Sequence, residues 1–132
     1  MGNKNALRAK EGERKRLLVI SVSNGYIVGW NSGHYIGRGG KGKNGSALAN
    51  PFRLQDTSNE TERDIVIAKY RSWLWQKIQQ KDSAITAELN YLKQQALVGD
   101  VNLLCFCKQP TREVACHGDV IKSCLEWMLQ PK

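Results

Sequence analysis

The hydrophobic positions of this 132-residue chain follow two spacings, one typical of strands and one typical of helices. Residues 17–23 are dense in apolar and β-branched side chains, which predicts a strand. Asn24 and Gly25 then predict a two-residue hairpin turn, after which residues 26–30 would return as a second strand. Residues 34–37 predict a short third strand. Residues 17–37 are therefore expected to form β-structure.

Apolar positions then recur every three or four residues, which predicts two successive helices. The first is expected to begin at a capping box formed at Thr57 or Asn59 and to end near Gln80. The second is expected to run from Asp82 or Ser83 to about Leu97. The positions that should face the core are Ile67, Tyr70, Leu74 and Ile78 in the first helix and Ile85, Leu89, Leu92 and Ala96 in the second.

A strand and a helix complete the pattern. The apolar density of residues 101–107 predicts a central strand buried on both faces, and the last helix should begin near Gly118, with Cys124 as a buried thiol. The order ββ(β)ααβα predicts an α/β fold with three or four helices packed on a small mixed sheet. We expect a single domain over residues 17–132, preceded by a basic flexible arm over residues 1–16.

Charge is unevenly distributed along the chain. The net charge is +8, and residues 14–55 contain seven Lys and Arg and no acidic residue. This excess favours an anionic partner such as a nucleotide or a nucleic acid. No apolar run approaches the ~20 residues of a membrane span, so no membrane partner is expected. Four cysteines without a secretory signal indicate free thiols and a cytoplasmic location.

A glycine-rich basic loop follows the third predicted strand. Between Arg38 and Ser46 lie four glycines and three basic residues. Backbone N–H groups near Gly37 and Gly39 could approach a phosphate closely, with Arg38 and Lys41 supplying charge. The loop lacks the ending of a Walker motif, and a mobile surface loop is the plain alternative.

Two further polar residues are candidates for the same ligand. Asn50 is expected to contact a sugar or base, or to fix the end of the loop. Arg63 lies in the first turn of a helix, where the dipole mildly disfavours a cation. It would either face the phosphate or be an ordinary surface residue.

Cys116, His117, Gly118 and Asp119 stand where the last helix should begin. Backbone N–H groups at a helix start lack intrahelical partners and suit anions, which makes Gly118 a ligand-binding candidate. Cys116 as nucleophile, His117 as base and Asp119 as orienter are the catalytic candidates. The alternative for Asp119 is a helix cap.

Zinc is a rival interpretation of the cysteines. Cys105, Cys107, Cys116 and His117 would make a Cys₃His ligand set. Their spacing departs from the usual zinc knuckle, in which two to four residues separate the paired cysteines. We therefore expect no cofactor, with zinc as the alternative, and regard Cys105 as a small core residue.

Several motifs in order resemble the family known as domain of unknown function 4326, over about residues 17–129. The motifs are Tyr35-Ile36-Gly37-Arg38, Asn50-Pro51-Phe52, Arg63 with residues 69–74, Leu104-Cys105-Phe106-Cys107 and Cys116-His117-Gly118-Asp119-Val120-Ile121. The resemblance implies a site at Tyr35, Gly37, Arg38, Asn50, Arg63, Cys107, Cys116, His117 and Asp119. It implies no particular reaction, and the loop from Cys107 to Cys116 is longer than in the family.

Together these features predict a domain that binds a phosphate-bearing ligand, either a nucleotide or a nucleic-acid end. The ligand would lie between the loop of residues 37–46 and the start of the last helix, and whether the protein is an enzyme is left open. Two alternatives remain. One is a non-enzymatic nucleic-acid-binding module that uses residues 1–16 and the loop. The other is a structural zinc-binding domain.

Overall fold

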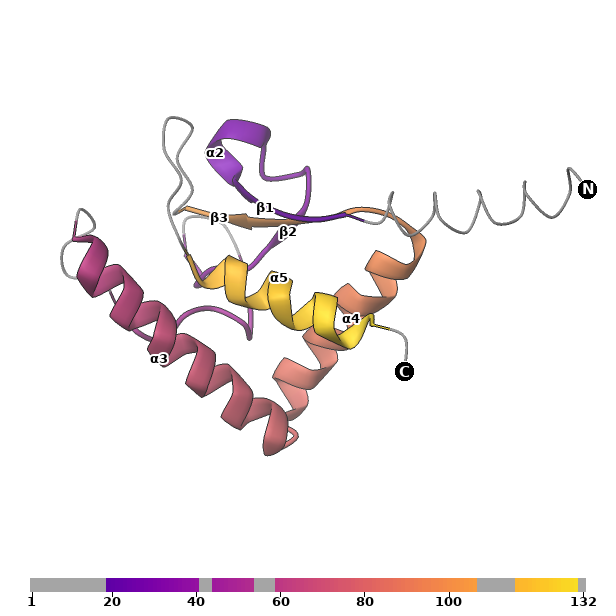
Figure 1. The fold of residues 1–132 in the computed structure, drawn as a ribbon. Coiled ribbons are helices and arrows are strands. Elements are labelled where there is room, and N and C mark those ends of the chain that lie inside the picture. Colours follow the sequence, from indigo (N-terminus) through magenta and orange to yellow (C-terminus); the bar gives the residue numbers. More distant parts are fainter. Residues whose placement is uncertain (1–18, 41–43, 54–58, 107–115, 131–132) are drawn as a thin grey trace, which may run out of the picture.

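The computed structural model describes residues 19–40, 44–53, 59–106 and 116–130 (Figure 1). Its elements are β1 (Ile20–Asn24), α2 (Gly25–Val28), β2 (His34–Tyr35), α3 (Glu60–Gln79), α4 (Ser83–Val98), β3 (Val101–Cys105) and α5 (His117–Met128). The α/β class predicted from the sequence is confirmed. The proposed arm over residues 1–16 lies outside the described residues.

The sheet is built around β3. Its strand order is β1-β3-β2, and β3 pairs in parallel with both neighbours. Ile20 is in register with Val101, and Asn24 with Cys105. Four of the five β3 residues are buried, which confirms the central strand predicted from its apolar density. Within the described residues the sheet is parallel throughout rather than mixed.

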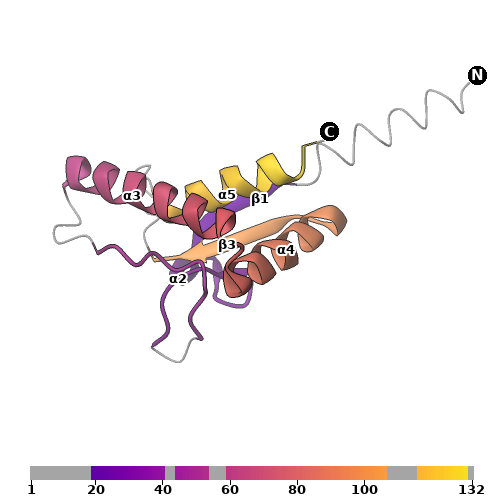
Figure 2. The ribbon, with the colours of Figure 1, turned by 90° about the horizontal axis from the view of Figure 1, so that it is seen from below.

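Three helices lie on one side of this sheet (Figure 1), and α4 and α5 contact its strands. In Figure 1, α3, α4 and α5 lie on one side of the strands and α2 lies on the other. Seen from below, α5 runs alongside β1 and α4 alongside β3 (Figure 2), in agreement with the contacts between these elements. Ser21 and Ser23, on the other face of β1, are polar, as expected for a face that the helices do not cover.

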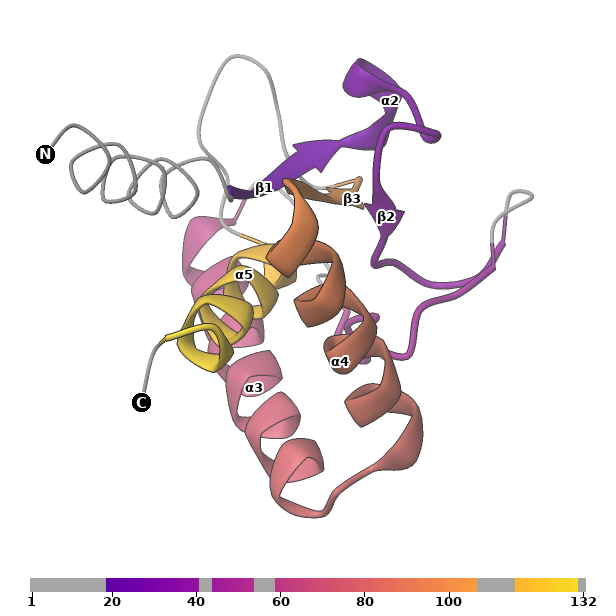
Figure 3. The ribbon, with the colours of Figure 1, turned by 90° about the vertical axis from the view of Figure 1, so that its right-hand side faces the viewer.

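The two long helices form a hairpin against which α5 packs (Figure 3). Asn59 caps α3, since its side chain accepts a hydrogen bond from the Glu62 N–H at 2.9 Å. Asp82 caps α4 in the same way, and Gly99 ends it. The positions predicted to face the core are buried at Tyr70, Leu74, Ile85, Leu89, Leu92 and Ala96 and partly buried at Ile67 and Ile78.

The predicted hairpin at Asn24 and Gly25 is wrong. The Asn24 side chain accepts a hydrogen bond from the Tyr26 N–H at 2.9 Å, so it caps the short helix α2 where we expected a turn. Asn suits both roles because its short polar side chain can pair with nearby backbone. Gly25 is required for packing, since a Cβ there would lie 2.1 Å from the Trp30 ring. The second expected strand is therefore absent, and β1 pairs with β3 instead.

Cys124 lies on α5 as expected. It is partly buried against the hydrophobic core, and burial raises the pKa of its thiol. This environment suits an inert packing residue more than a reactive one.

Candidate ligand site at the carboxyl edge of the sheet

The carboxyl ends of the three parallel strands meet at one edge, where α5 also begins. Gly118 marks the closeness of this contact. A Cβ on Gly118 would lie 2.6 Å from Cγ1 of Val22 and 2.9 Å from Cδ1 of Ile36. Only glycine lets the first turn of α5 sit against both segments. In open parallel sheets this edge is the usual place for ligands.

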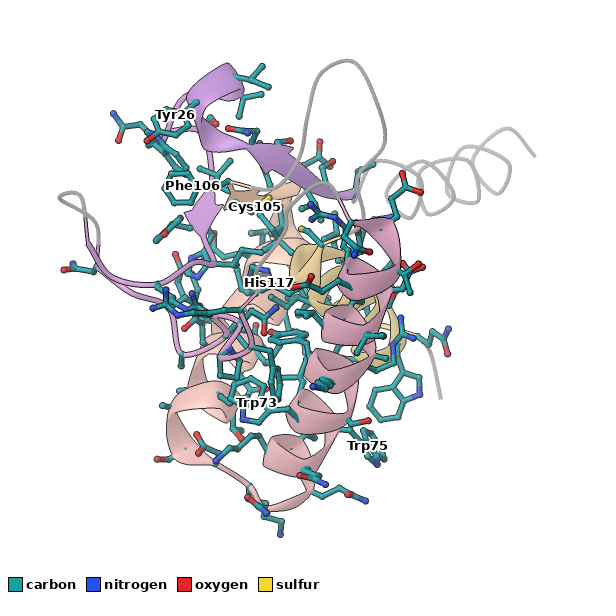
Figure 4. All side chains as sticks on the ribbon, turned by 90° about the vertical axis from the view of Figure 1, so that its left-hand side faces the viewer. Tyr26, Trp73, Trp75, Cys105, Phe106 and His117 are labelled. Atoms are coloured by element: carbon teal, nitrogen blue, oxygen red, sulfur yellow. The ribbon has the colours of Figure 1, made fainter. Side chains whose placement is uncertain are left out.

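His117 joins the start of α5 to the segment that follows β2. Its Nε2 lies 2.8 Å from the carbonyl oxygen of Ile36, and the Ile36 N–H donates to the Leu104 carbonyl at 3.0 Å. A carbonyl only accepts, so Nε2 carries the hydrogen and Nδ1 is the nitrogen that can take up a proton. His117 is buried within the fold (Figure 4), and the Tyr70 ring packs edge-on against it with centroids 5.2 Å apart.

Burial lowers the pKa of His117, and the positive charge of Arg38 lowers it further. The Ile36 carbonyl, Cys105 and Asp119 act in the opposite direction without reversing the shift. His117 is therefore neutral near pH 7. The contact between Nε2 of His117 and the Ile36 carbonyl places the start of α5 beside the residue that precedes Gly37.

Asp119 and Cys116 close the first turn of α5. The Cys116 N–H donates to Oδ2 of Asp119 at 2.9 Å, and the Gly118 N–H donates to Sγ of Cys116 at 3.2 Å. This reciprocal capping confirms the structural alternative for Asp119. It also means that the helix's own side chains use part of the donor capacity that we expected to face a ligand.

Cys105 and Cys116 bring their sulfur atoms to 3.7 Å from each other. Two thiolates on one tetrahedral zinc, each ~2.3 Å from the metal, would be separated by a similar distance of about 3.8 Å. The third expected thiol, Cys107, lies outside the described residues. Among the described residues no group of three or more His, Cys, Asp or Glu side chains could hold a metal. Cys105 is only 1% exposed, as expected for a core residue.

Arg38, at the start of the glycine-rich loop, is hydrogen-bonded to the segment that follows the loop. Its Nη2 donates to the carbonyl oxygens of Asn50 at 2.5 Å and Phe52 at 3.4 Å. Its own carbonyl accepts a hydrogen bond from Oη of Tyr35 at 2.7 Å. The Ser46 N–H donates to the Gly37 carbonyl at 2.9 Å, which brings the far side of the loop back to the site. Lys41 lies outside the described residues.

Asn50 fixes the end of the loop. Its Oδ1 accepts a hydrogen bond from the Phe52 N–H at 2.9 Å, a local turn typical of Asn before proline. Gly45 is needed for packing, because a Cβ there would lie 2.7 Å from the Gly39 nitrogen. The loop of residues 37–46 is thus closed by specific contacts where it leaves and rejoins the fold.

Arg63 is buried, with 6% of its surface exposed, so the alternative of an ordinary surface residue is wrong. It shares one face of α3 with Val66 and Tyr70, at helical spacing. Tyr70 in turn packs on His117. A guanidinium stays charged, so it is buried only where it has partners. Arg63 therefore belongs to the inner side of α3.

Two groups of side chains at the site could not be predicted from the sequence. Glu88 of α4 accepts hydrogen bonds from His34, from the Ser46 hydroxyl and from the Ala47 N–H, and so ties the loop to a helix. Four aromatic rings also gather at the carboxyl edge, at Tyr26, Trp30, Tyr35 and Phe106. The partners in both groups are distant in sequence, and only the parallel sheet brings them together.

Two hollows lie elsewhere. One, of about 490 Å³, is a groove beside α3 lined by Phe52, Ile65, Ala68, Lys69, Ser72, Trp73 and Gln76. The other, of about 480 Å³, lies at the amino half of β3, and Ser21, His34, Tyr91, Asp100 and Asn102 are among its lining residues. The groove beside α3 has one basic lining residue, Lys69, and the hollow at β3 has an acidic one, Asp100. Neither provides the clustered positive charge that an anion requires.

These features define the class of protein: a small α/β domain whose parallel sheet gathers polar, basic and aromatic side chains at its carboxyl edge. The chain belongs to the family described as Domain of unknown function (DUF4326), whose model matches residues 21–127. No curated protein and no solved structure matches the chain. Among the described helices, none combines the length and apolar character needed to span a bilayer.

Proposed function

We propose that this domain binds a phosphate-bearing ligand, a nucleotide or the end of a nucleic acid, at the carboxyl edge of its sheet. The ligand would lie between the Gly37–Arg38 corner and the start of α5. The contact from His117 to Ile36 carries the proposal, because it brings these two segments together across the sequence.

Arg38 is the residue that would hold the phosphate. It is exposed, and its carbonyl partners in the loop satisfy only part of its five donors. A guanidinium binds phosphate by parallel hydrogen bonds, and such charge-assisted bonds are stronger than neutral ones. The positive charge of the surrounding segment, with no acidic residue over positions 14–55, supports the same class of ligand.

His117 would act as a positioning residue in this proposal. Its Nε2 is engaged by the Ile36 carbonyl, so any proton transfer to a ligand would have to use Nδ1. Cys116, only 2% exposed, and Asp119, which caps α5, hold the helix start in place. Binding thus requires no chemistry from them, and catalysis by these three residues would be an additional property.

The sulfurs of Cys105 and Cys116 support a cytoplasmic setting for this function. They lie 3.7 Å from each other, in contact but without a disulfide bond between them. Such a pair persists as thiols where the surroundings are reducing.

Calorimetric titration with a nucleoside monophosphate and with inorganic phosphate tests the proposal. We expect Arg38→Gln to weaken binding by about tenfold or more, since a charged hydrogen bond contributes about 1.5–3 kcal/mol. Arg71→Gln is the matched control, because Arg71 is an exposed arginine on α3. Unchanged affinity in Arg38→Gln, with thermal unfolding confirming an intact fold, would reject the proposal.

A charge-driven nucleic-acid-binding module is the second candidate, favoured by the basic residues among positions 1–16. Deleting residues 1–16 separates the two functions. A site for a small phosphate ligand should survive the deletion, whereas a module that depends on the arm should lose affinity for single-stranded nucleic acid and its steep salt dependence.

A further inference from the structure

Four aromatic rings from different segments meet at the carboxyl edge of the sheet. Tyr26 comes from α2, Trp30 from the segment after it, Tyr35 from the end of β2, and Phe106 directly follows β3. We call these four residues the aromatic cluster. The Phe106 centroid lies 4.8 Å from that of Trp30, 5.3 Å from that of Tyr26 and 5.8 Å from that of Tyr35. Figure 4 shows Tyr26 and Phe106 side by side.

The aromatic cluster is a surface feature, distinct from the core. Tyr26 is 64% exposed and Phe106 is 38% exposed, whereas Tyr70 in the core is fully buried. Trp30 and Tyr35 are half-buried beneath them. Exposed apolar groups gathered in this way mark binding surfaces more often than stable packing. The cluster therefore presents aromatic surface to a partner.

The rings are held in fixed orientations. Trp30 meets Tyr26 at 77° and Tyr35 at 88°, the edge-to-face geometry that aromatic pairs prefer. Gly25 lies so close under Trp30 that any side chain there would displace the indole. Trp30 and Tyr35 thus support the two more exposed rings, and the surface is formed before a ligand arrives.

Tyr35 connects the aromatic cluster to the phosphate corner. Its ring packs against Trp30 and Phe106, while its Oη donates to the Arg38 carbonyl at 2.7 Å. Gly37 lies against the same hydroxyl, since a Cβ there would be 2.3 Å from it. A ligand whose phosphate lies at Arg38 would therefore have aromatic rings within reach of its other end.

We infer that the aromatic cluster stacks a nucleobase of the ligand whose phosphate is held at Arg38. The inference rests on the proposed function. It concerns the base of the ligand, which the phosphate contacts at Arg38 do not specify. A base has a flat π-face suited to stacking on Tyr26 and Phe106, and it is joined to phosphate by a short sugar link. An apolar peptide would match the rings but not the basic, acid-free segment around them.

Stacking of one base on an aromatic side chain contributes about 1–3 kcal/mol, which corresponds to about 5- to 150-fold in affinity. Calorimetry with matched ligands measures this directly: a nucleoside 5′-monophosphate, and ribose 5-phosphate, which has the same sugar and phosphate without the base. We expect the nucleotide to bind more tightly by a factor in that range. Tyr26→Ala should reduce its affinity toward that of ribose 5-phosphate and leave ribose 5-phosphate unaffected.

Tyr26→Phe keeps the ring and should retain binding. Tyr91→Ala is the matched control, because Tyr91 is similarly exposed, at 54%, and lies on α4. Both tyrosines are exposed, so neither substitution should prevent folding. A short single-stranded oligonucleotide, tested in parallel, shows whether the base belongs to a free nucleotide or to the end of a strand. In either case Tyr26→Ala should weaken binding.

These measurements distinguish a failure of base stacking from a failure of phosphate binding. If ribose 5-phosphate binds as tightly as the nucleotide, or if Tyr26→Ala binds the nucleotide as the wild type does, stacking is refuted while phosphate binding stands. If neither compound nor the oligonucleotide binds, the proposed function fails, and the inference that rests on it fails with it.

Discussion

His117 donates from Nε2 to the carbonyl oxygen of Ile36 at 2.8 Å, across 81 positions of sequence. Because the Ile36 N–H in turn donates to the Leu104 carbonyl, the ring extends the hydrogen bonding of the sheet to α5. The buried imidazole of His117 is therefore one of the contacts that hold Gly37 and Arg38 next to the start of α5.

The burial of His117 predicts a pH dependence of stability. Burial first, and then the charge of Arg38, lower the pKa of His117 below its usual 6.5. The unfolded chain thus binds this proton more tightly than the folded protein does. The stability contribution is fully present above about pH 6.5 and is lost as the pH falls toward the lower folded pKa.

Urea unfolding between pH 5 and pH 8 measures this effect. The wild type should lose stability toward pH 5, and His117→Gln should lose less over the same interval. Equal changes in the two proteins would mean that His117 does not titrate differently in the folded and unfolded states.

Gly118→Ala should disturb the start of α5. The added Cβ would lie 2.6 Å from Cγ1 of Val22, 2.9 Å from Cδ1 of Ile36 and 3.2 Å from Sγ of Cys116. We expect a loss of about 1–3 kcal/mol in the free energy of unfolding, as for overpacking in a core. Gly99→Ala is the control, since nothing lies within 4 Å of a Cβ there. A loss no larger than that of the control would contradict the close contact between α5 and the sheet.

Tyr70→Phe removes a buried hydrogen bond. Oη of Tyr70 donates to the Leu48 carbonyl at 2.6 Å, and the substitution would leave that carbonyl without this donor. Burial raises the pKa of Tyr70, so the hydroxyl stays protonated. We expect a destabilisation of about 1–3 kcal/mol in chemical unfolding, and almost none for Tyr91→Phe at an exposed position. Similar values for both variants would show that this bond does not secure the loop.

Glu88→Gln should loosen the loop. Burial alone would raise the pKa of Glu88, but hydrogen bonds from His34, Ser46 and Ala47 outweigh it and lower the pKa. Its contribution to stability is thus present above about pH 4.5 and is lost as the pH falls further. We expect Glu88→Gln to be less stable than the wild type at pH 7 by about 1–3 kcal/mol, with a smaller difference near pH 3.5.

The exposed Glu126→Gln provides the baseline for this comparison. Thermal or urea unfolding at both pH values is sufficient. A Glu88→Gln difference that persists undiminished at low pH would show that the carboxylate charge is not the source of the effect.

The helical half of the fold could be predicted because local patterns specify it. Asn59 and Asp82 are typical cap residues and mark the starts of α3 and α4 in the sequence. The apolar positions predicted for α4 are all buried. The β half was harder. Asn24 suits both a hairpin and a helix cap, and which one forms depends on whether a distant strand pairs with β1. That partner is β3, and the apolar density of its residues correctly predicted that it is the central strand of the sheet.

The candidate site shows the same division. Capping by Asp119 and the core position of Cys105 follow from local sequence and burial patterns. Burial of Arg63 and the gathering of four aromatic rings do not, because each depends on contacts between segments far apart in the chain. The family to which the chain belongs was indicated by motifs in their order, which no single motif would have established.

The most direct test of ligand binding at the carboxyl edge is an amide ¹H–¹⁵N NMR titration of the wild-type protein with a nucleoside 5′-monophosphate. Ligand binding at this edge predicts saturable shifts at Gly37, Arg38 and Gly39, at His117 and Gly118, and at Phe106, with little change along the exposed face of α3. Absence of saturable shifts, or shifts confined to the hollows beside α3 or at the amino half of β3, would contradict it.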